Sequence, residues 1–131
     1  MTKKRILFIE DEPDQVMMVT MRLEANNWEV MSAMDGEEGL KKVKEKKPDL
    51  ILLDLVMPKL DGAQVCRRLK EDPTTKKIPI IVMTASGVKN LEKKCLALGA
   101  EDIIRKPYDS LDLVAKVKAL LGELNENNAG C

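Results

Sequence analysis

The sequence predicts one α/β domain in which a five-stranded parallel sheet is covered by helices on both faces. Five short apolar segments alternate with five longer segments of helical periodicity. Segments that are apolar at consecutive positions suit strands that are buried on both faces, and the alternation of strands with helices is typical of parallel sheets. A length of 131 residues fits one ordinary domain.

The expected strands are short. The first, third and fourth are runs of large apolar residues, the second is weaker and the fifth is very short. In chain order they cover residues 6–9, 28–33, 50–53, 78–83 and 103–104.

Helices are expected between these strands, because apolar residues recur there three, four or seven positions apart. Asp35 and Asp61 each precede such a segment in the manner of an N-cap, and Gly99 is a plausible stop for the fourth helix. We expect residues 1–124 to form the domain and the polar tail, residues 125–131, to be disordered. The apolar positions, helix by helix, are Val16, Val19 and Leu23; Leu40 and Val43; Val65, Cys66 and Leu69; Leu91, Cys95 and Leu98; and Leu113, Val117, Leu120 and Leu124.

The composition excludes several classes of function. Lys plus Arg and Asp plus Glu both number 22, so the net charge is zero and nothing indicates direct nucleic-acid binding. The absence of histidine excludes histidine-based triads, histidine zinc sites and phosphohistidine carriers. The three aromatic residues do not favour a platform for stacking bases.

The cysteines and the N-terminus indicate a cytoplasmic setting. Cys66, Cys95 and Cys131 are widely spaced, odd in number and form no disulfide framework. The apolar run that follows the basic N-terminus ends at Glu10, which is too short for a signal peptide or a membrane span. We therefore expect no association with a membrane.

Polar residues that suit chemistry stand where the expected strands end. Glu10 and Asp11 follow the first strand, Asp54 the third and Thr84 the fourth, while the fifth runs into Lys106. The carboxyl ends of parallel strands lie at one edge of a sheet, where such folds bind ligands. These five residues should therefore converge.

Each residue taken alone has an ordinary explanation. An acidic pair after a strand is often a helix cap, threonine suits strand ends, and a lysine can simply face solvent. Asp54 is harder to explain in this way, because it follows four large apolar residues and an unpaired buried carboxylate costs several kcal/mol. The set as a whole favours a functional site.

The residue types fit phosphoryl transfer. Crowded carboxylates raise one another's pKa unless a cation neutralises them, and Mg²⁺ prefers oxygen ligands. Asp54 could attack a phosphoryl donor as a nucleophile. The metal and Lys106 would offset the charge on the transferred group, and the Thr84 hydroxyl would reach one of its oxygens.

With these residues, the chain resembles the receiver domain of bacterial response regulators over residues 4–121. The resemblance implies a flavodoxin-like (βα)5 three-layer sandwich with strand order 2-1-3-4-5. The motifs that carry it are Ile9-Glu10-Asp11, Pro48 followed by the segment up to Asp54, Met57-Pro58 with Asp61-Gly62, Met83-Thr84-Ala85, Gly99-Ala100 and Lys106-Pro107.

The resemblance also implies the roles of individual residues. Asp54 is the expected phosphoacceptor, Thr84 and Lys106 are the expected switch pair, and the Lys106–Pro107 peptide bond is expected to be cis. Ile103 departs from the pattern, because many members carry at this position an aromatic or histidine ring that rotates on activation, and isoleucine has no such ring. The expected ligands of Mg²⁺ or Mn²⁺ are Glu10, Asp11, Asp54 and the backbone carbonyl of Val56.

The function expected from this resemblance is a phosphorylation-dependent switch of a two-component system. A histidine kinase or a histidine phosphotransfer protein would donate the phosphoryl group, and the chain would catalyse only its own Mg²⁺-dependent phosphorylation and dephosphorylation. The downstream partner would contact the face formed by the fourth helix, fifth strand and fifth helix. The expected contacts there are Lys89, Lys93, Lys94, Arg105 and Tyr108.

Alternatives stay open at this point. The chain could be a receiver domain excised from a longer transcription factor or hybrid kinase. A flavodoxin-like nucleotide or flavin binder would need a phosphate loop rich in Gly, Ser or Thr, where this chain has Glu10-Asp11-Glu12. A phosphatase of the haloacid dehalogenase type would need an aspartate where this chain has Val56.

Overall fold

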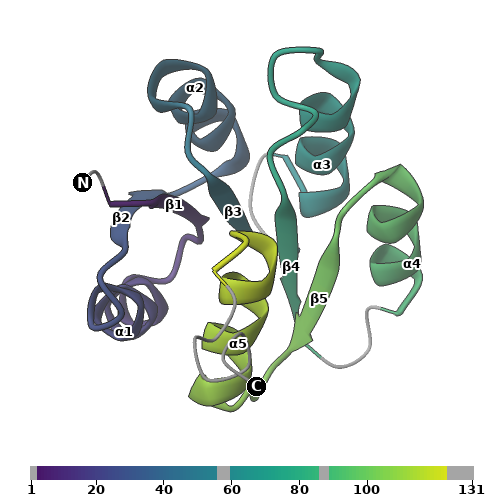
Figure 1. Ribbon diagram of the computed structural model, residues 1–131. Helices are drawn as coiled ribbons and strands as arrows, with labels where there is room; N and C mark the ends of the chain where they lie inside the picture. The colour runs from purple at the N-terminus through teal and green to yellow at the C-terminus, as the bar shows by residue number, and fades with distance from the viewer. Residues whose placement is uncertain (1–2, 56–59, 86–88, 124–131) are drawn as a thin grey trace.

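The computed structural model describes residues 3–55, 60–85 and 89–123, and these form five strands and five helices that alternate along the chain (Figure 1). All strand pairs are parallel, and the strand order is β2-β1-β3-β4-β5, so the predicted fold is confirmed. The elements are β1 (Arg5–Ile9), α1 (Pro13–Glu24), β2 (Glu29–Ala33), α2 (Gly36–Lys46), β3 (Leu50–Asp54), α3 (Gly62–Glu71), β4 (Ile80–Thr84), α4 (Lys89–Leu98), β5 (Asp102–Arg105) and α5 (Ser110–Leu120).

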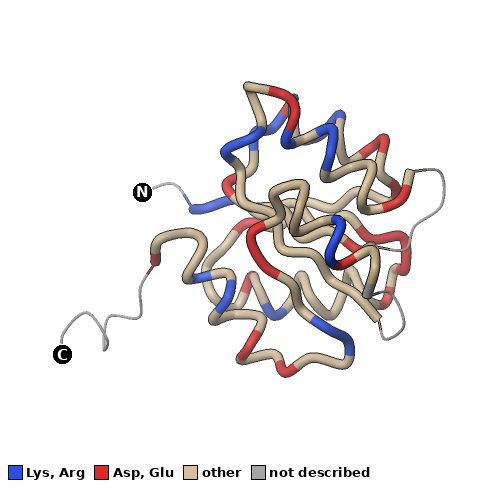
Figure 2. Tube along the Cα trace, turned by 90° about the vertical axis from the view of Figure 1, so that its right-hand side faces the viewer, with Lys and Arg blue, Asp and Glu red and all other residues tan. Residues whose placement is uncertain are grey.

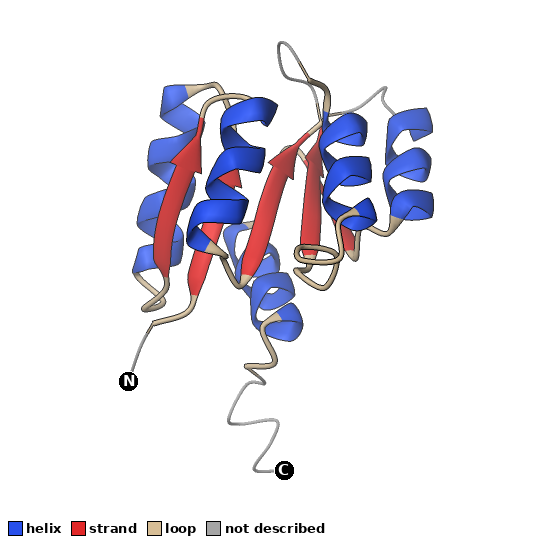
Figure 3. Cartoon of the chain, turned by 90° about the horizontal axis from the view of Figure 1, so that it is seen from above, coloured by secondary structure: helices blue, strands red, loops and turns tan. Residues whose placement is uncertain are grey.

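The helices cover the sheet as two layers. Helices α1 and α5 lie on one face, and α2, α3 and α4 lie on the other (Figures 1 and 3). Alternate residues of each strand point to opposite faces. Leu7 and Ile9 of β1 therefore pack in the cluster under α2, α3 and α4, while Ile6 and Phe8 pack in the cluster under α1 and α5. These four side chains are fully buried.

The strand ends differ slightly from the prediction. Strands β3 and β4 each continue one residue further, to Asp54 and Thr84, because Asp54 pairs with Met83 of β4 and Thr84 pairs with Arg105 of β5. Strand β4 begins at Ile80 instead of residue 78, since Ile78 is held in a turn by a hydrogen bond from its backbone N–H to the Thr75 carbonyl.

The helix caps explain where several helices begin. Asp35 accepts a hydrogen bond from the Glu38 N–H, and Asp61 forms a full capping box with Gln64. Helix α1 is capped by Glu12, which accepts from the Asp14 N–H. Capping therefore does not account for the acidic pair that precedes Glu12.

Glycine at position 62 allows α3 to start directly beside the end of β3. A Cβ atom at Gly62 would lie 2.8 Å from the Leu55 Cα atom and 3.1 Å from the Asp54 carbonyl oxygen. The Gly62 N–H donates to the Leu55 carbonyl at 3.0 Å. This close approach fixes the helix against the strand that carries Asp54.

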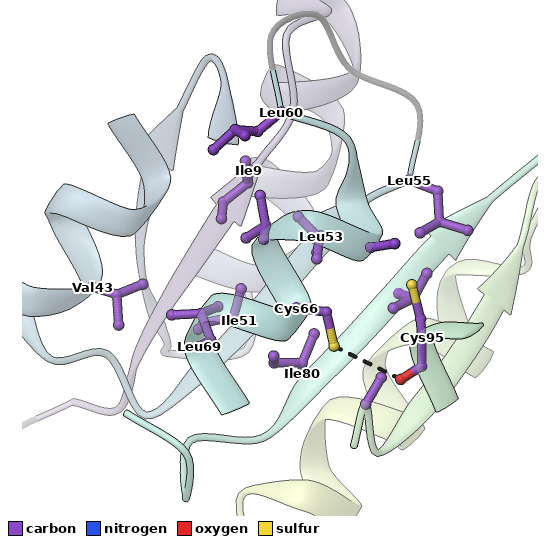
Figure 4. Close-up of a cluster of buried hydrophobic side chains, with 14 of the residues drawn as sticks. Ile9, Val43, Ile51, Leu53, Leu55, Leu60, Cys66, Leu69, Ile80 and Cys95 are labelled. Atoms are coloured by element: carbon purple, nitrogen blue, oxygen red, sulfur yellow. Dashed lines mark hydrogen bonds between the residues drawn. The ribbon is translucent and has the colours of Figure 1, made fainter. Parts of the chain in front are cut away.

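Helices α3 and α4 are joined in the core. Cys66 of α3 and Cys95 of α4 are both fully buried thiols. The Cys66 thiol donates to the Cys95 backbone carbonyl, with 3.7 Å between sulfur and oxygen (Figure 4). Their packing against Leu69 and Ile80 holds the two helices side by side over the sheet.

Trp28 forms a long-range hydrogen bond at the opposite edge of the sheet, where the strands begin. Its indole N–H donates to the Glu123 carboxylate at 2.9 Å, which links the start of β2 to the segment after α5. The predicted tail, residues 125–131, lies outside the described residues. In the part of the chain that is described, no helix has the length and apolar character needed to cross a membrane.

Candidate functional site

The five strands end at the same edge of the sheet (Figure 3), and three carboxylates meet at that edge. Carboxylate oxygens of Glu10, Asp11 and Asp54 lie within 4.8 Å of one another. The strand register explains this, because Ile9 of β1 pairs with Leu53 of β3, which places the residues that follow them side by side. Glu10 and Asp54 are buried, whereas Asp11 is exposed.

Lys106 adds a cation to this cluster from the end of β5. Its ammonium nitrogen lies 3.3 Å from a Glu10 oxygen and 3.7 Å from an Asp54 oxygen. The peptide bond between Lys106 and Pro107 is cis, as predicted. The lysine therefore neutralises part of the charge of two buried acids that come from other strands.

Burial and crowding change the proton affinity of Glu10. Its pKa is raised to about 7, first by burial and then by the charge of Asp54 and a hydrogen bond with it. Lys106 acts in the opposite direction but does not cancel these effects. One lysine is thus too little positive charge for this set of acids, and an oxygen-rich anionic cluster of this kind fits a hard divalent cation.

The hydrogen bond that links Thr84 to Lys106 is made by the backbone carbonyl of Thr84, whereas its hydroxyl bonds to a different residue. The side chain is fully buried, and its hydroxyl donates to the Ala85 carbonyl at 3.1 Å. The Thr84 carbonyl accepts from the Lys106 N–H at 2.7 Å. The two predicted switch residues are therefore adjacent, but the threonine hydroxyl would have to rotate to meet a group on Asp54.

Ile103 and Tyr108 lie on opposite faces of the sheet. Ile103 is partly buried and packs against the cluster under α2, α3 and α4, as do Leu91 and Leu98 of α4. Tyr108 is partly buried in the cluster under α1 and α5, so it is less exposed than predicted. Burial and the nearby charge of Glu10 raise the pKa of Tyr108.

The structure describes some of the other predicted contact and ligand positions but not all of them. Lys93, Lys94 and Arg105 are exposed, as predicted. Val56, whose carbonyl is an expected metal ligand, lies outside the described residues, and the same holds for the side chain of Lys89.

Two features beside the site have no clear signal in the sequence. Glu92 of α4 is buried, and its carboxylate binds the Arg105 guanidinium at 2.9 Å, which ties α4 to the end of β5. Helix α1 also exposes Met17, Met18 and Met21, each by 60% or more. Periodicity places apolar residues on a helix but does not show which of them a neighbouring element covers.

This fold and this acidic edge define a class of protein. The chain belongs to the response regulator receiver domain family, whose family model matches residues 6–118. Receiver domains are signalling switches of two-component systems and not conventional enzymes, and they bind Mg²⁺ in an acidic site. This membership favours the receiver over the flavin-binding and phosphatase alternatives.

Particular relatives support the same placement. The chain is 41% identical over 118 residues to the alkaline phosphatase synthesis transcriptional regulatory protein PhoP of Bacillus subtilis, an alignment that covers 90% of this chain and 48% of that protein. It is also 41% identical to the response regulator PleD of Caulobacter vibrioides, over 88% of this chain and 26% of PleD. The chain thus spans half or less of the length of these two regulators.

Solved structures agree in fold. The receiver domain of a signal transduction histidine kinase from Syntrophus aciditrophicus is 33% identical with a TM-score of 0.86, and the match covers 93% of this chain and 92% of that one. The receiver domain of a sensor histidine kinase from Pseudomonas aeruginosa PAO1 is 26% identical with a TM-score of 0.85, over 92% and 99% of the two chains. That second structure is described with a magnesium ion coordinated in its active site cleft.

Proposed function

We propose that Asp54 is the phosphoacceptor of this receiver. The observation that carries the proposal is the position of its carboxylate, 7% exposed, at the end of a fully buried strand and within 4.8 Å of two further acids. The Lys106 ammonium lies 3.7 Å from this carboxylate, at the same edge of the sheet. Glu10 shares the burial and the cluster, but it follows β1, whereas Asp54 is itself the last residue of a strand that is buried throughout.

The metal that fits this cluster is Mg²⁺ or Mn²⁺, held by the carboxylates of Glu10, Asp11 and Asp54. The fit rests on the donor set, since three carboxylates with one lysine leave negative charge to be balanced. The backbone carbonyl of Val56, outside the described residues, is the fourth proposed ligand. When bound, the ion supplies positive charge to the oxygens of the transferred group.

The chain's own residues perform the transfer. An Asp54 oxygen forms a bond to phosphorus while the bond from phosphorus to the donor's histidine nitrogen breaks, and that nitrogen keeps the electron pair. Lys106 offsets charge on the phosphoryl oxygens, and Thr84 donates its hydroxyl to one of them after rotating away from the Ala85 carbonyl. Water later releases phosphate, so the chain acts only on itself.

The phosphoryl donor is a histidine kinase or histidine phosphotransfer protein, because the chain contains no histidine of its own. We place its docking surface on the methionine-rich side of α1. A cavity of about 450 Å³ there is lined by Met17 and Met21 together with Glu10 and Asp11. Exposed apolar side chains beside an acceptor site suit a protein partner.

The proposed output is a change of the surface formed by α4, β5 and α5, with Lys93, Arg105 and the half-buried Tyr108 as contacts. The Glu92–Arg105 pair supports this choice, because it connects α4 to the strand end that carries Lys106. The thiols of Cys66 and Cys95 support a cytoplasmic location.

Phosphorylation of the purified chain tests the acceptor. Acetyl phosphate with Mg²⁺ should add the mass of one phosphoryl group to the wild type and to an Asp14→Asn control, which loses an exposed acid of α1. Asp54→Asn should acquire none. Equal labelling of Asp54→Asn and wild type would show that another residue is the acceptor.

A further inference from the structure

The two helical layers carry very different charge, although the chain as a whole has none. Helices α2, α3 and α4 contain ten Lys or Arg residues against five Asp or Glu. Helices α1 and α5 contain three of each sign. One of the five acids, Glu92, is buried and already bound to Arg105. The α2–α3–α4 layer is therefore the basic side of the molecule, while acidic residues gather at the edge where the strands end (Figure 2).

Three of these basic side chains line a groove between α3 and α4. A cavity of about 280 Å³ there is lined by Ala63, Gln64, Arg67, Arg68 and Lys94, with no acidic residue in its lining. The three cationic side chains are exposed. Within residues 3–55, 60–85 and 89–123, none of the three takes part in an ion pair.

The neighbouring groove, between α2 and α3, is different. It shares Arg68 but also contains Asp72, which binds the Lys44 ammonium at 3.6 Å. Its positive charge is thus partly neutralised from within the chain. One other described cavity is lined by two cations and no carboxylate, Arg22 and Lys106, but that lysine is already paired with acids of the site. Among the described cavities, only the α3–α4 groove has three cations in its lining and no carboxylate.

We propose that the α3–α4 groove binds an acidic segment of a partner protein through its Asp or Glu carboxylates. Guanidinium groups bind carboxylates through two parallel hydrogen bonds, and adjacent arginines on one helix with a lysine opposite present such donors from both walls. A cavity of about 280 Å³ is large enough for carboxylate side chains, but it lies below the range of about 300–1,000 Å³ that is usual for small-molecule sites.

The same surface does not suit nucleic acid. A phosphate backbone needs a continuous track of positive charge, whereas Glu71 and Asp72 interrupt the basic residues at the end of α3. None of the three aromatic residues of the chain lines the groove, so it offers no stacking platform. A protein partner with clustered carboxylates is the occupant that these charges fit.

The α3–α4 groove is a binding site separate from the proposed phosphorylation switch. Lys94 lines the α3 side of helix α4, whereas its neighbour Lys93 does not line the groove. The two lysines, which the sequence placed together on one output face, therefore belong to different surfaces. Binding in the groove needs neither phosphorylation nor a metal ion.

The test uses a fluorescein-labelled hexaglutamate peptide and the full chain, without a metal ion or a phosphoryl donor. Fluorescence anisotropy at low salt should show binding to the wild type. Combined Arg67→Ala, Arg68→Ala and Lys94→Ala substitution should weaken that binding about tenfold or more. A control with the same loss of charge, Lys4→Ala, Arg22→Ala and Lys77→Ala, removes exposed cations elsewhere and should keep most of the affinity.

Two results would overturn the proposal. Equal weakening in both triple variants would mean that the peptide responds only to net charge. Tighter binding of a single-stranded DNA of equal charge, through the same three residues, would mean that nucleic acid is the occupant. Thermal unfolding of both triple variants near the wild-type temperature verifies that each is folded, as expected for changes at exposed positions.

Discussion

The ammonium of Lys106 lies 3.3 Å from the carboxylate of Glu10, although 96 positions separate the two residues in the chain. The contact joins the end of β5 to the end of β1 across the site. It holds the lysine beside the acids before any phosphoryl group arrives. Phosphorylation of Asp54 would therefore make the lysine exchange one anionic partner for another, and this exchange connects the chemistry to the position of β5.

The stability of the metal-free protein should depend on pH through Glu10. Its pKa is raised from 4.5 in the unfolded reference to about 7, so the folded protein holds the extra proton between these values. The free energy of unfolding then falls as pH rises through this window, by at most about 3 kcal/mol from this group. Urea unfolding in EDTA at several pH values should show a flatter profile for Glu10→Gln. An exposed control, Glu45→Gln, should follow the wild type, and identical profiles for all three proteins would contradict the assignment.

Removal of Asp11 should weaken Mg²⁺ binding about tenfold or more, since the remaining acids are fewer and the raised pKa of Glu10, about 7, leaves that carboxyl partly protonated near neutral pH. Titration calorimetry of Asp11→Asn against Asp14→Asn separates the loss of a ligand from the loss of one negative charge. Unchanged affinity in Asp11→Asn would exclude it as a ligand. Trp28 is buried at the opposite end of the sheet, so its fluorescence should change little when Mg²⁺ binds.

Thr84→Ala should allow phosphorylation of Asp54 but prevent most of the conformational change that follows it. Asp54 should still accept the phosphoryl group, but the hydrogen bond that shifts the β4–α4 connection, on the order of 1.5–3 kcal/mol, would be lost. Backbone NMR with beryllium fluoride should show a much smaller change in α4 than in the wild type. Thr84→Ser keeps the hydroxyl and should restore the response. A full response in the alanine variant would remove Thr84 from the switch.

Ile103 should keep one rotamer when the site is occupied. The residue is β-branched and therefore stiff, and it packs against the same buried cluster as Leu91 and Leu98 of α4. We expect the segment 84–90, of which 86–88 lie outside the described residues, to move instead. Methyl NMR of Ile103 with and without beryllium fluoride measures this directly. A rotamer change as large as the movement of the segment would show that isoleucine replaces the ring found in other members.

The sequence predicted the site best for those residues whose positions are set by the sheet topology alone. Glu10, Asp11, Asp54 and Lys106 converge because each ends or follows a strand of one parallel sheet, and the carboxyl ends of such strands share an edge. A run of apolar residues ending in a charge was enough to predict this. The predicted strand ends were wrong by a residue or two, since pairing to a neighbour continues for as long as the register allows.

Features that depend on how a side chain or a helix is rotated could not be predicted. The hydroxyl of Thr84 is turned toward the Ala85 carbonyl, which is a choice among rotamers. Lys94 faces α3, and Glu92 of the same helix is buried against Arg105, because packing sets the rotation of α4 about its axis. The exposure of the α1 methionines likewise depends on what covers the helix, not on its periodicity.

The pairing of Arg105 with the buried Glu92 has a consequence for how this receiver can diverge. Two neighbouring cations at the end of β5 hold different acids: Lys106 holds Glu10 in the site, and Arg105 holds Glu92 in α4. A change at position 105 would therefore remove an ion pair between β5 and α4, while Lys106 and the acids of the site would keep their contacts. If α4, β5 and α5 form the output surface as proposed, a change at position 105 would affect the response of α4, whereas a change at position 106 would affect the chemistry at Asp54.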